Sequence, residues 1–288
     1  MDATSVELAI VGAGKTGRAL GRLARQAGYA IGPVVCRTRA HAEEAVAFIG
    51  AGRPGTSPEG APLTLVAVPD REIPAVARAL RAPSGAVVAH TCAAYGADVL
   101  RPHRPAGALH PLRSFGDPAR AAELFRGTFC AIDGDPEAVA ALEGFARAIG
   151  GEPFRVRTDR KALYHAGAVF ASNYVVAVLE AAVRLLEGSG VDRATAGRAL
   201  VALASGTLAN VAAVGIPQAL TGPIERGDVE TVRRHVEALG ASAPELARTY
   251  GVLGLRAVEV ALAKGTIDSS TAERLRAALR AEESKGAA

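Results

Sequence analysis

The chain has 288 residues, of which 49% are hydrophobic and 22% charged, and its formal net charge is +4. This length allows two domains, and the composition is that of a globular protein rather than a disordered or fibrous one. The 33 basic residues include only four lysines and are spread along the chain without a dense basic block. We therefore expect no nucleic-acid surface, whereas an anionic ligand is compatible with this charge.

The three cysteines, Cys36, Cys92 and Cys130, are far apart and form no C-x-x-C pair. They predict neither a disulfide framework nor a zinc site, and they are typical of a reducing cytoplasm. The polar start of the sequence gives no sign of a signal peptide.

The first half of the chain alternates strand and helix signals, which predicts a doubly wound, mostly parallel sheet. Apolar runs predict strands at about residues 6–11, 30–36, 63–68, 85–90, 107–110, 128–132 and 153–156. Helical patterns predict helices at about 16–27, 40–49 and 136–149, and another after Asp70. Residues 52–60 are rich in Gly and Pro and are predicted to be a loop.

Strand-like runs nearly vanish after residue 157, so we expect a Rossmann-like domain over 1–157 and an all-helical domain over 158–288. The expected helices lie at about 159–187, 192–214, 228–239, 244–264 and 271–282. Residues 166–186 approach the length of a membrane span, but Asn173, Glu180 and Arg184 interrupt them. Because charges are costly in lipid, we expect a buried core helix and no membrane contact.

Gly12, Gly14 and Gly17 follow the first apolar run at the G-x-G-x-x-G spacing and precede a helix. Gly12 permits a tight turn, Gly14 lets the backbone approach a pyrophosphate, and Gly17 lets the helix pack close to the strand. The helix start, which includes Lys15 and Thr16, offers unpaired N–H groups to the anion. Strand, spacing and helix together predict a dinucleotide-binding turn.

The second predicted strand ends in Arg37, Thr38 and Arg39, where an NAD-binding protein would carry an acid for the ribose 2′-hydroxyl. Two guanidinium groups and a hydroxyl suit a 2′-phosphate instead, because arginine forms charge-assisted hydrogen bonds to phosphate oxygens. This pattern favours NADP(H). The alternative is a solvated basic loop in an arginine-rich chain.

Three residues are expected beside the cofactor at the carboxyl edge of the sheet, where open α/β folds bind ligands. Val68 and Pro69 end one central strand, and Thr91 follows the next and could contact the nicotinamide ribose. Pro69 could equally be a strand terminator.

Four polar residues are candidates for catalysis: His110, Lys161, His165 and Asn173. His110 ends a short strand before a proline, and an imidazole there could exchange a proton with a substrate oxygen. Lys161 and His165 are four residues apart on one helix face, with Asn173 further along, and such groups are costly to bury on an apolar helix without a purpose. The alternatives are a backbone-bonded histidine and a solvated helix end.

With these motifs in this order, the sequence resembles a bacterial family in which a Rossmann-like domain is joined to a DUF2520 domain. The resemblance covers nearly the whole chain and rests on Ile10–Lys15, Val68-Pro69-Asp70, Leu109–Leu112, Tyr164-His165-Ala166, Ser172-Asn173-Tyr174 and Leu220–Pro223. More distantly the chain is similar to the superfamily of ketopantoate reductase, pyrroline-5-carboxylate reductase, prephenate dehydrogenase, β-hydroxyacid dehydrogenases and coenzyme F420-dependent NADP oxidoreductases.

This resemblance implies a homodimer formed through the helical domain and a lysine and an asparagine that serve the substrate, here Lys161 and Asn173. Their spacing of twelve is wider than the four of hydroxyacid dehydrogenases, so Lys161 with His165 is the closer geometric match. His110-Pro111 resembles the catalytic His-Pro of prephenate dehydrogenases in position only.

The first hypothesis is therefore an NADP(H)-dependent oxidoreductase that reduces the C=O of a small anionic keto acid, in the manner of ketopantoate reductase. An imino acid is the alternative substrate. In this hypothesis Lys161 or His165 supplies the proton, Asn173 orients the substrate and His110 contacts its polar end. Two further hypotheses are a non-catalytic NADPH sensor and an enzyme exchanging hydride between NADPH and coenzyme F420.

Overall fold

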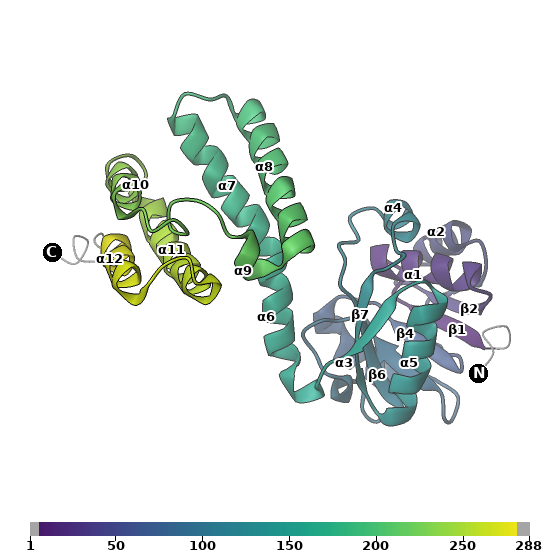
Figure 1. Cartoon of the computed structure of the whole chain (residues 1–288). Coiled ribbons are helices and arrows are strands. Elements are labelled where there is room, and N and C mark those ends of the chain that lie inside the picture. Colours follow the sequence, from purple (N-terminus) through teal and green to yellow (C-terminus); the bar gives the residue numbers. More distant parts are fainter. Residues whose placement is uncertain (1–5, 281–288) are drawn as a thin grey trace. The chain divides into compact units, whose positions relative to one another are not determined.

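The computed structural model describes residues 6–280 and divides into two compact units, Met1–Ala171 and Ser172–Ala288 (Figure 1). The first unit is an α/β sheet structure that ends with one helix, and the second is all-helical. The division falls later than the change of pattern near residue 157, because the helix that follows the last strand belongs to the first unit.

An eight-stranded sheet forms the first unit, in the order β3-β2-β1-β4-β5-β6-β7-β8. All neighbouring strands are parallel except β6 and β7, which confirms the predicted doubly wound, mostly parallel fold. The strands are β1 Glu7–Val11, β2 Ala30–Val35, β3 Arg53–Gly55, β4 Leu63–Val66, β5 Val87–His90, β6 Ala106–Pro111, β7 Phe129–Gly134 and β8 Glu152–Arg155.

Helices cover both faces of this sheet. One core cluster packs β1, β4 and β6 against four helices through side chains such as Leu20, Phe125 and Phe145. These helices are α1 Lys15–Gln26, α2 Arg39–Ile49, α4 Pro118–Glu123 and α5 Pro136–Ala148. A second cluster on the other face joins β4 and β5 to α3 Ile73–Ala79 and to the 3₁₀ turn η3 Ala97–Leu100. Both faces are buried, as the continuous apolar runs of the strands require.

A short strand and a short helix are among the elements that the sequence does not predict. The strand β3 lies within the predicted loop 52–60 and includes Pro54. A proline is tolerated there because β3 is an edge strand that pairs only with β2 among the described strands. The helix α4 begins at Pro118 after the N-cap Asp117, whose carboxylate accepts two backbone N–H groups.

The predicted helix over 159–187 is divided into two. The 3₁₀ turn η4 Thr158–Arg160 leads into α6 Lys161–Ala171, and α7 Asn173–Gly188 begins after Ser172. Ser172 has φ −127° and ψ −76°, outside the helical region. The division into units falls at this same residue.

The second unit contains six helices within the described residues: α7, α8 Arg193–Val214, α9 Ile216–Ala219, α10 Val229–Ser242, α11 Pro244–Lys264 and α12 Ser269–Arg280. Its core joins α10, α11 and α12 through residues such as Val232, Val258 and Leu275. The predicted end of the last helix, Glu282, lies outside the described residues.

The expectation that residues 166–186 form a buried core helix is wrong. Val183 is the one buried residue of α7, and Ala196 the one buried residue of α8, within the described chain. Val176, Leu203 and Leu208 are each at least 60% exposed. These two helices pack mainly on each other, so the α10–α12 core leaves their apolar faces uncovered.

The glycine turn after β1 gives a first test of the fold. A Cβ atom at residue 17 would lie 2.4 Å from the Gly12 carbonyl oxygen, whereas a Cβ at residue 14 would meet nothing within 4 Å. Gly17→Ala is expected to lower the free energy of unfolding by about 1–3 kcal/mol, as other overpacking changes do. Gly14→Ala, the matched control, should lower it by less than about 1 kcal/mol. Urea denaturation of both variants checks this, and equal losses would contradict the close packing of Gly17.

Candidate functional site

A pocket of about 500 Å³ opens at the carboxyl edge of the sheet. Lys15 and Thr16 line it from the start of α1, Thr91 from the residue after β5, and His110 and Pro111 from the end of β6. This edge is where open α/β sheets bind ligands. The topology thus brings together four residues that the sequence assigned to the site from separate motifs: Lys15, Thr16, Thr91 and His110.

The rest of the lining is the loop after β6, from Arg113 to Gly116. Among the described residues that line the pocket none carries a carboxylate, so Lys15 and Arg113 make it cationic. The Arg113 Nε atom is buried and has no hydrogen-bond partner within residues 6–280. A buried guanidinium N–H without an acceptor is costly, and an anion in the pocket would satisfy it. Sequence analysis missed Arg113, whose only signal is its place three residues after His110.

The glycine turn has the geometry that an approaching anion requires. Gly12 has φ +94°, and a Cβ there would lie 2.5 Å from the Val68 Cγ1 atom. Val68 therefore packs directly against the turn, and Pro69 follows it before the 3₁₀ turn η2 Asp70–Glu72. Gly14 instead faces open space, because a Cβ on it would touch nothing within 4 Å. The backbone is thus open to a ligand at Gly14 and closed at Gly12.

The predicted 2′-phosphate residues lie at the end of β2, and all three are exposed. Thr38 caps α2, because its hydroxyl oxygen accepts the His41 backbone N–H at 3.3 Å. Arg39 donates to the Glu43 carboxylate at 2.8 Å and to the Pro54 carbonyl at 2.9 Å. Thr38 and Arg39 therefore also stabilise the local structure.

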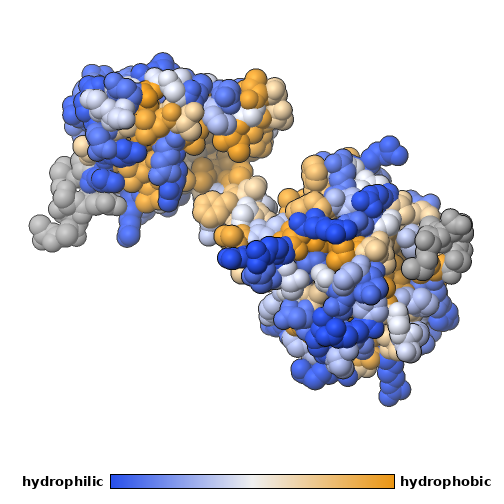
Figure 2. All heavy atoms as spheres, turned by 60° about the horizontal axis from the view of Figure 1, so that its bottom comes forward, coloured by the Kyte–Doolittle hydropathy of each residue, from blue (hydrophilic) through white to orange (hydrophobic). Residues whose placement is uncertain are grey.

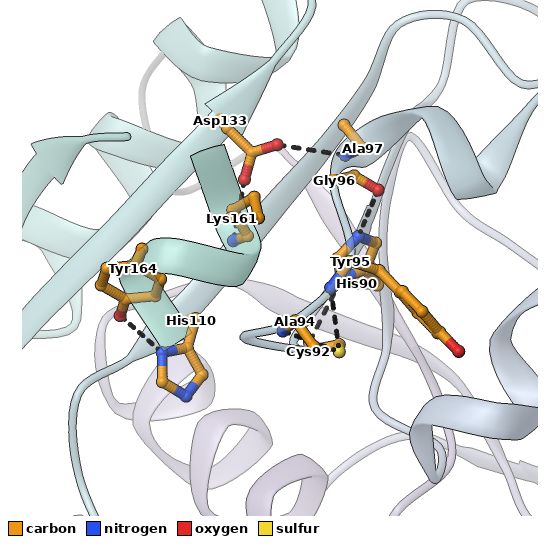
Figure 3. Close-up of polar contacts among 10 residues, drawn as sticks. All are labelled: His90, Cys92, Ala94, Tyr95, Gly96, Ala97, His110, Asp133, Lys161 and Tyr164. Carbon is orange, nitrogen blue, oxygen red and sulfur yellow. Dashed lines mark hydrogen bonds and ion pairs between the residues drawn. The ribbon is translucent and has the colours of Figure 1, made fainter. Parts of the chain in front are cut away.

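His110 meets the first helix after the sheet (Figure 3). Its Nδ1 atom lies 2.7 Å from the hydroxyl of Tyr164 on α6, and the two rings pack edge to face. Burial, together with the charge of Lys161, lowers the pKa of His110 to about 4. Burial also raises the pKa of Tyr164 well above its usual value. Near pH 7 the imidazole is therefore neutral and the phenol protonated.

Lys161 begins α6 as a buried ammonium group. Its Nζ atom lies 2.9 Å from the Asp133 carboxylate on β7, and the two side chains are only 2% and 1% exposed. The second carboxylate oxygen of Asp133 accepts the Ala97 backbone N–H at 3.1 Å. The Lys161 Nζ atom also lies 5.5 Å from the centre of the Tyr164 ring. Lys161 thus fixes the start of α6 on the sheet and places a positive charge behind Tyr164.

The two other candidates on these helices are placed differently. His165 is half-buried on α6, and its charge contributes to the lowered pKa of His110. Asn173 is the first residue of α7 and belongs to the second unit.

His90 lies in no catalytic motif of the sequence, and the structure gives it a structural role. Its Nδ1 atom accepts the Cys92 backbone N–H at 3.2 Å, and its Nε2 atom donates to the Gly96 carbonyl at 3.0 Å (Figure 3). Both ring nitrogens are therefore bound to backbone, and burial lowers the pKa of this buried imidazole. His90 holds the loop after β5 and has no free nitrogen for chemistry.

Two known domain families match different parts of the chain. Residues 1–113 match the Rossmann-like domain, and residues 128–257 match the domain of unknown function DUF2520. The chain therefore carries matches to both domains of the resembling family, in the expected order. The DUF2520 match begins before β7, so it includes Asp133 and Lys161 as well as α7 to α10 and most of α11. A comparison with curated proteins gives no match.

Solved structures with the same fold span nearly the whole chain. A protein from Thermotoga maritima is 26% identical, covers 93% of this chain and 99% of its own, and has a TM-score of 0.72. A candidate NADP oxidoreductase from Bacteroides fragilis is 22% identical, with coverages of 89% and 99% and a TM-score of 0.69. A reductive aminase from Aspergillus terreus, solved with NADPH and ethyl-5-oxohexanoate, is 18% identical, with coverages of 98% and 95% and a TM-score of 0.57.

The Lys161–Asp133 pair gives a test of how the site is held. Lys161→Met leaves a buried carboxylate without its counter-charge, so we expect the free energy of unfolding to fall by about 3–5 kcal/mol. Adding Asp133→Asn should recover part of this loss, because the uncompensated charge is then gone. Arg256→Met, which removes an exposed ion pair with Glu259, should cost less than about 1 kcal/mol. Chemical denaturation measures all three, and a Lys161→Met loss as small as that of Arg256→Met would contradict this role.

Proposed function

We propose that the protein is an NADP(H)-dependent oxidoreductase that transfers a hydride to the C=O or C=N carbon of a small anionic keto or imino acid. The observation that carries this proposal is the pocket itself. It joins the start of α1, directly after the glycine turn, to His110 and to the unpartnered Arg113, with no carboxylate in its lining. Such a pocket can take a pyrophosphate at one end and an acidic substrate at the other.

The cofactor would be held by residues that the sequence and the fold bring to one edge. Gly12, Gly14 and Gly17 shape the turn, and Lys15 and Thr16 line the pocket beside it. Val68, Pro69 and Thr91 follow β4 and β5 toward the nicotinamide end. When bound, NADPH supplies the hydride. Its 2′-phosphate would lie on Arg37, Thr38 and Arg39, which are exposed at the end of β2.

The substrate acid would bind Arg113, whose buried Nε atom has no acceptor within the described residues. His110 lines the same pocket and would donate a hydrogen bond to the oxygen or nitrogen that is being reduced. Of the two predicted proton donors, Lys161 is buried against Asp133 and supplies charge, and the half-buried His165 is not among the described residues that line the pocket. Asn173 is assigned the role of orienting the substrate, and this assignment rests on the sequence alone.

Two substrate classes remain within this proposal. A keto acid of the ketopantoate type is favoured by the sequence resemblance. An imine is favoured by the likeness of nearly the whole chain to the reductive aminase. Both reactions deliver one hydride to carbon and one proton to the neighbouring heteroatom, so the same pocket chemistry serves both.

The decisive experiment is NADPH oxidation by the purified protein against a panel of small keto acids and cyclic imines, with NADPH and NADH binding titrated alongside. We expect tight NADPH binding and turnover of one panel class. NADPH binding without turnover would favour the sensor hypothesis. Turnover with a deazaflavin alone would favour exchange with coenzyme F420.

The cofactor preference has its own test. Arg37→Ala with Arg39→Ala should weaken NADPH binding about 10- to 100-fold and leave NADH binding nearly unchanged, because only NADPH carries the 2′-phosphate. Arg53→Ala, which removes a positive charge from the neighbouring strand β3, is the matched control and should affect neither cofactor. Isothermal titration measures the affinity for each cofactor in the native chain and in both variants. Equal weakening of NADPH and NADH would contradict the assignment.

We also propose that a second copy of the chain covers the apolar faces of α7 and α8. Figure 2 shows hydrophobic residues gathered on the surface of the helical unit. The exposed large hydrophobic residues of α7 and α8 include Val176, Val201, Leu203 and Leu208. Exposed apolar surface of this extent marks interaction sites.

A membrane is the competing partner for this surface. Residues Thr158–Gly188 and Arg193–Val214 are long and apolar enough to cross one. Arg193, however, binds Glu180 at 2.7 Å and Glu187 at 2.9 Å. This group of charges beside the connection between the two helices favours a protein partner.

Light scattering after size exclusion tests this second proposal. We expect a dimer for the native chain and a monomer for Val201→Glu with Leu208→Glu, because two charges would be buried in the contact. Ala277→Glu places the same charge on an exposed position of α12 and should stay dimeric. A monomeric native chain that binds phosphatidylcholine vesicles would instead support a membrane partner.

A further inference from the structure

His110 has two ring nitrogens in different surroundings. Its side chain lines the pocket, but its Nδ1 atom is bound to Tyr164, which is not one of the lining residues. The nitrogen left for the pocket is therefore Nε2 (Figure 3). This differs from His90, where both nitrogens are bound to backbone groups. Which nitrogen of His110 carries the proton decides what the pocket can do.

The surroundings of Tyr164 decide the direction of this hydrogen bond. The bond to His110 is the only one that its hydroxyl makes within residues 6–280. If His110 donated from Nδ1, the half-buried phenol O–H would have no acceptor within the described residues, which is unfavourable. If Tyr164 donates, both groups are satisfied. The Lys161 ammonium, 5.5 Å from the ring centre, favours this direction because a nearby positive charge makes a phenol a better donor.

We propose that Tyr164 is a positioning residue that holds neutral His110 with its proton on Nε2, and that the pair relays this proton to the substrate. The relay rests on the proposed function, whereas the proton position does not. A neutral imidazole can polarise a carbonyl group in this way. The residue that orients the donor thus lies outside the pocket, on α6.

The proton transfer balances without any further reactant. As NADPH delivers hydride to the carbon, the π electrons of the C=O or C=N bond move to the heteroatom, which takes the Nε2 proton of His110. The Nδ1 atom takes the hydroxyl proton of Tyr164 in the same step. Water then protonates the Nε2 atom, and the Nδ1 proton returns to the Tyr164 phenolate, which restores the starting pair. The Lys161 ammonium behind the ring stabilises the phenolate during this exchange.

The charges around His110 keep its imidazole neutral over a wide range of pH. The ionisable groups that act on it come from α6, β5 and η2: Lys161, His165, His90 and Asp70. The first three lower its pKa and Asp70 raises it, and with burial the pKa is about 4. The neutral imidazole is therefore expected to persist from pH 8 down to about pH 5. As pH approaches 4 the Nδ1 atom gains a proton and can no longer accept the Tyr164 hydroxyl proton, so the relay is expected to fail there.

The proton position can be measured without any substrate. Histidine ring nitrogens in the full-length ¹⁵N-labelled protein give different chemical shifts when protonated and unprotonated. We expect a protonated Nε2 and an unprotonated Nδ1 for His110, assigned by the signals lost in His110→Gln. Tyr164→Phe should shift His110 toward a mixture of both tautomers. A proton on Nδ1 of His110 in the native chain would overturn the proposal.

Kinetics test the relay. Tyr164→Phe should lower kcat about 10- to 100-fold at unchanged KM and NADPH affinity, because orientation of the donor is lost and the pocket is not. Tyr250→Phe is the matched control, since Tyr250 makes a similar bond of 2.8 Å to His235 in the second unit. Native kcat in Tyr164→Phe would overturn the relay. The expected tautomer without turnover of any substrate would support the proton position and count against the reductase function.

Discussion

The buried ion pair between Lys161 and Asp133 is the interaction on which the site depends. It joins the first residue of α6 to β7, with both side chains almost fully excluded from solvent. Two charges are costly to bury, and the pair is stabilising only while both partners are present. The pair sets where α6 begins on the sheet, which in turn brings Tyr164 to His110 and fixes the course of the helix that carries His165.

The reversal of β7 makes this arrangement possible. Because β6 and β7 are antiparallel, His110 lies opposite Ala131 and Ala108 opposite Asp133. Opposite residues share a face of a sheet, and every second residue along a strand returns to that face. His110 and Asp133 therefore project from the same side of neighbouring strands. On this shared face β6 supplies the ligand-facing imidazole, and β7 anchors the helix that orients it.

Local patterns predicted the parts of the site that local sequence determines. The glycine turn, the strands and the position of His110 each depend on a few neighbouring residues, and the structure places Lys15, Thr16, Thr91 and His110 in one pocket.

Long-range contacts were not predictable in this way. Tyr164 and His110 are 54 positions apart, and nothing in either segment signals the other. Arg113 is one of many arginines until burial of its Nε atom distinguishes it. The exposed faces of α7 and α8 were mistaken for a core because apolar composition shows that a helix avoids water but not what covers it.

The break at Ser172 also has a consequence for how the protein is made. Every residue of the pocket and of the polar group behind it precedes Ser172 in the chain. During synthesis the amino-terminal part of a protein folds first. The pocket residues and the helix that completes the hydrogen-bond pair therefore emerge from the ribosome before the helices whose apolar faces need a partner. Site formation can then precede assembly, and a nascent chain has its ordered sheet in place when those apolar helices emerge.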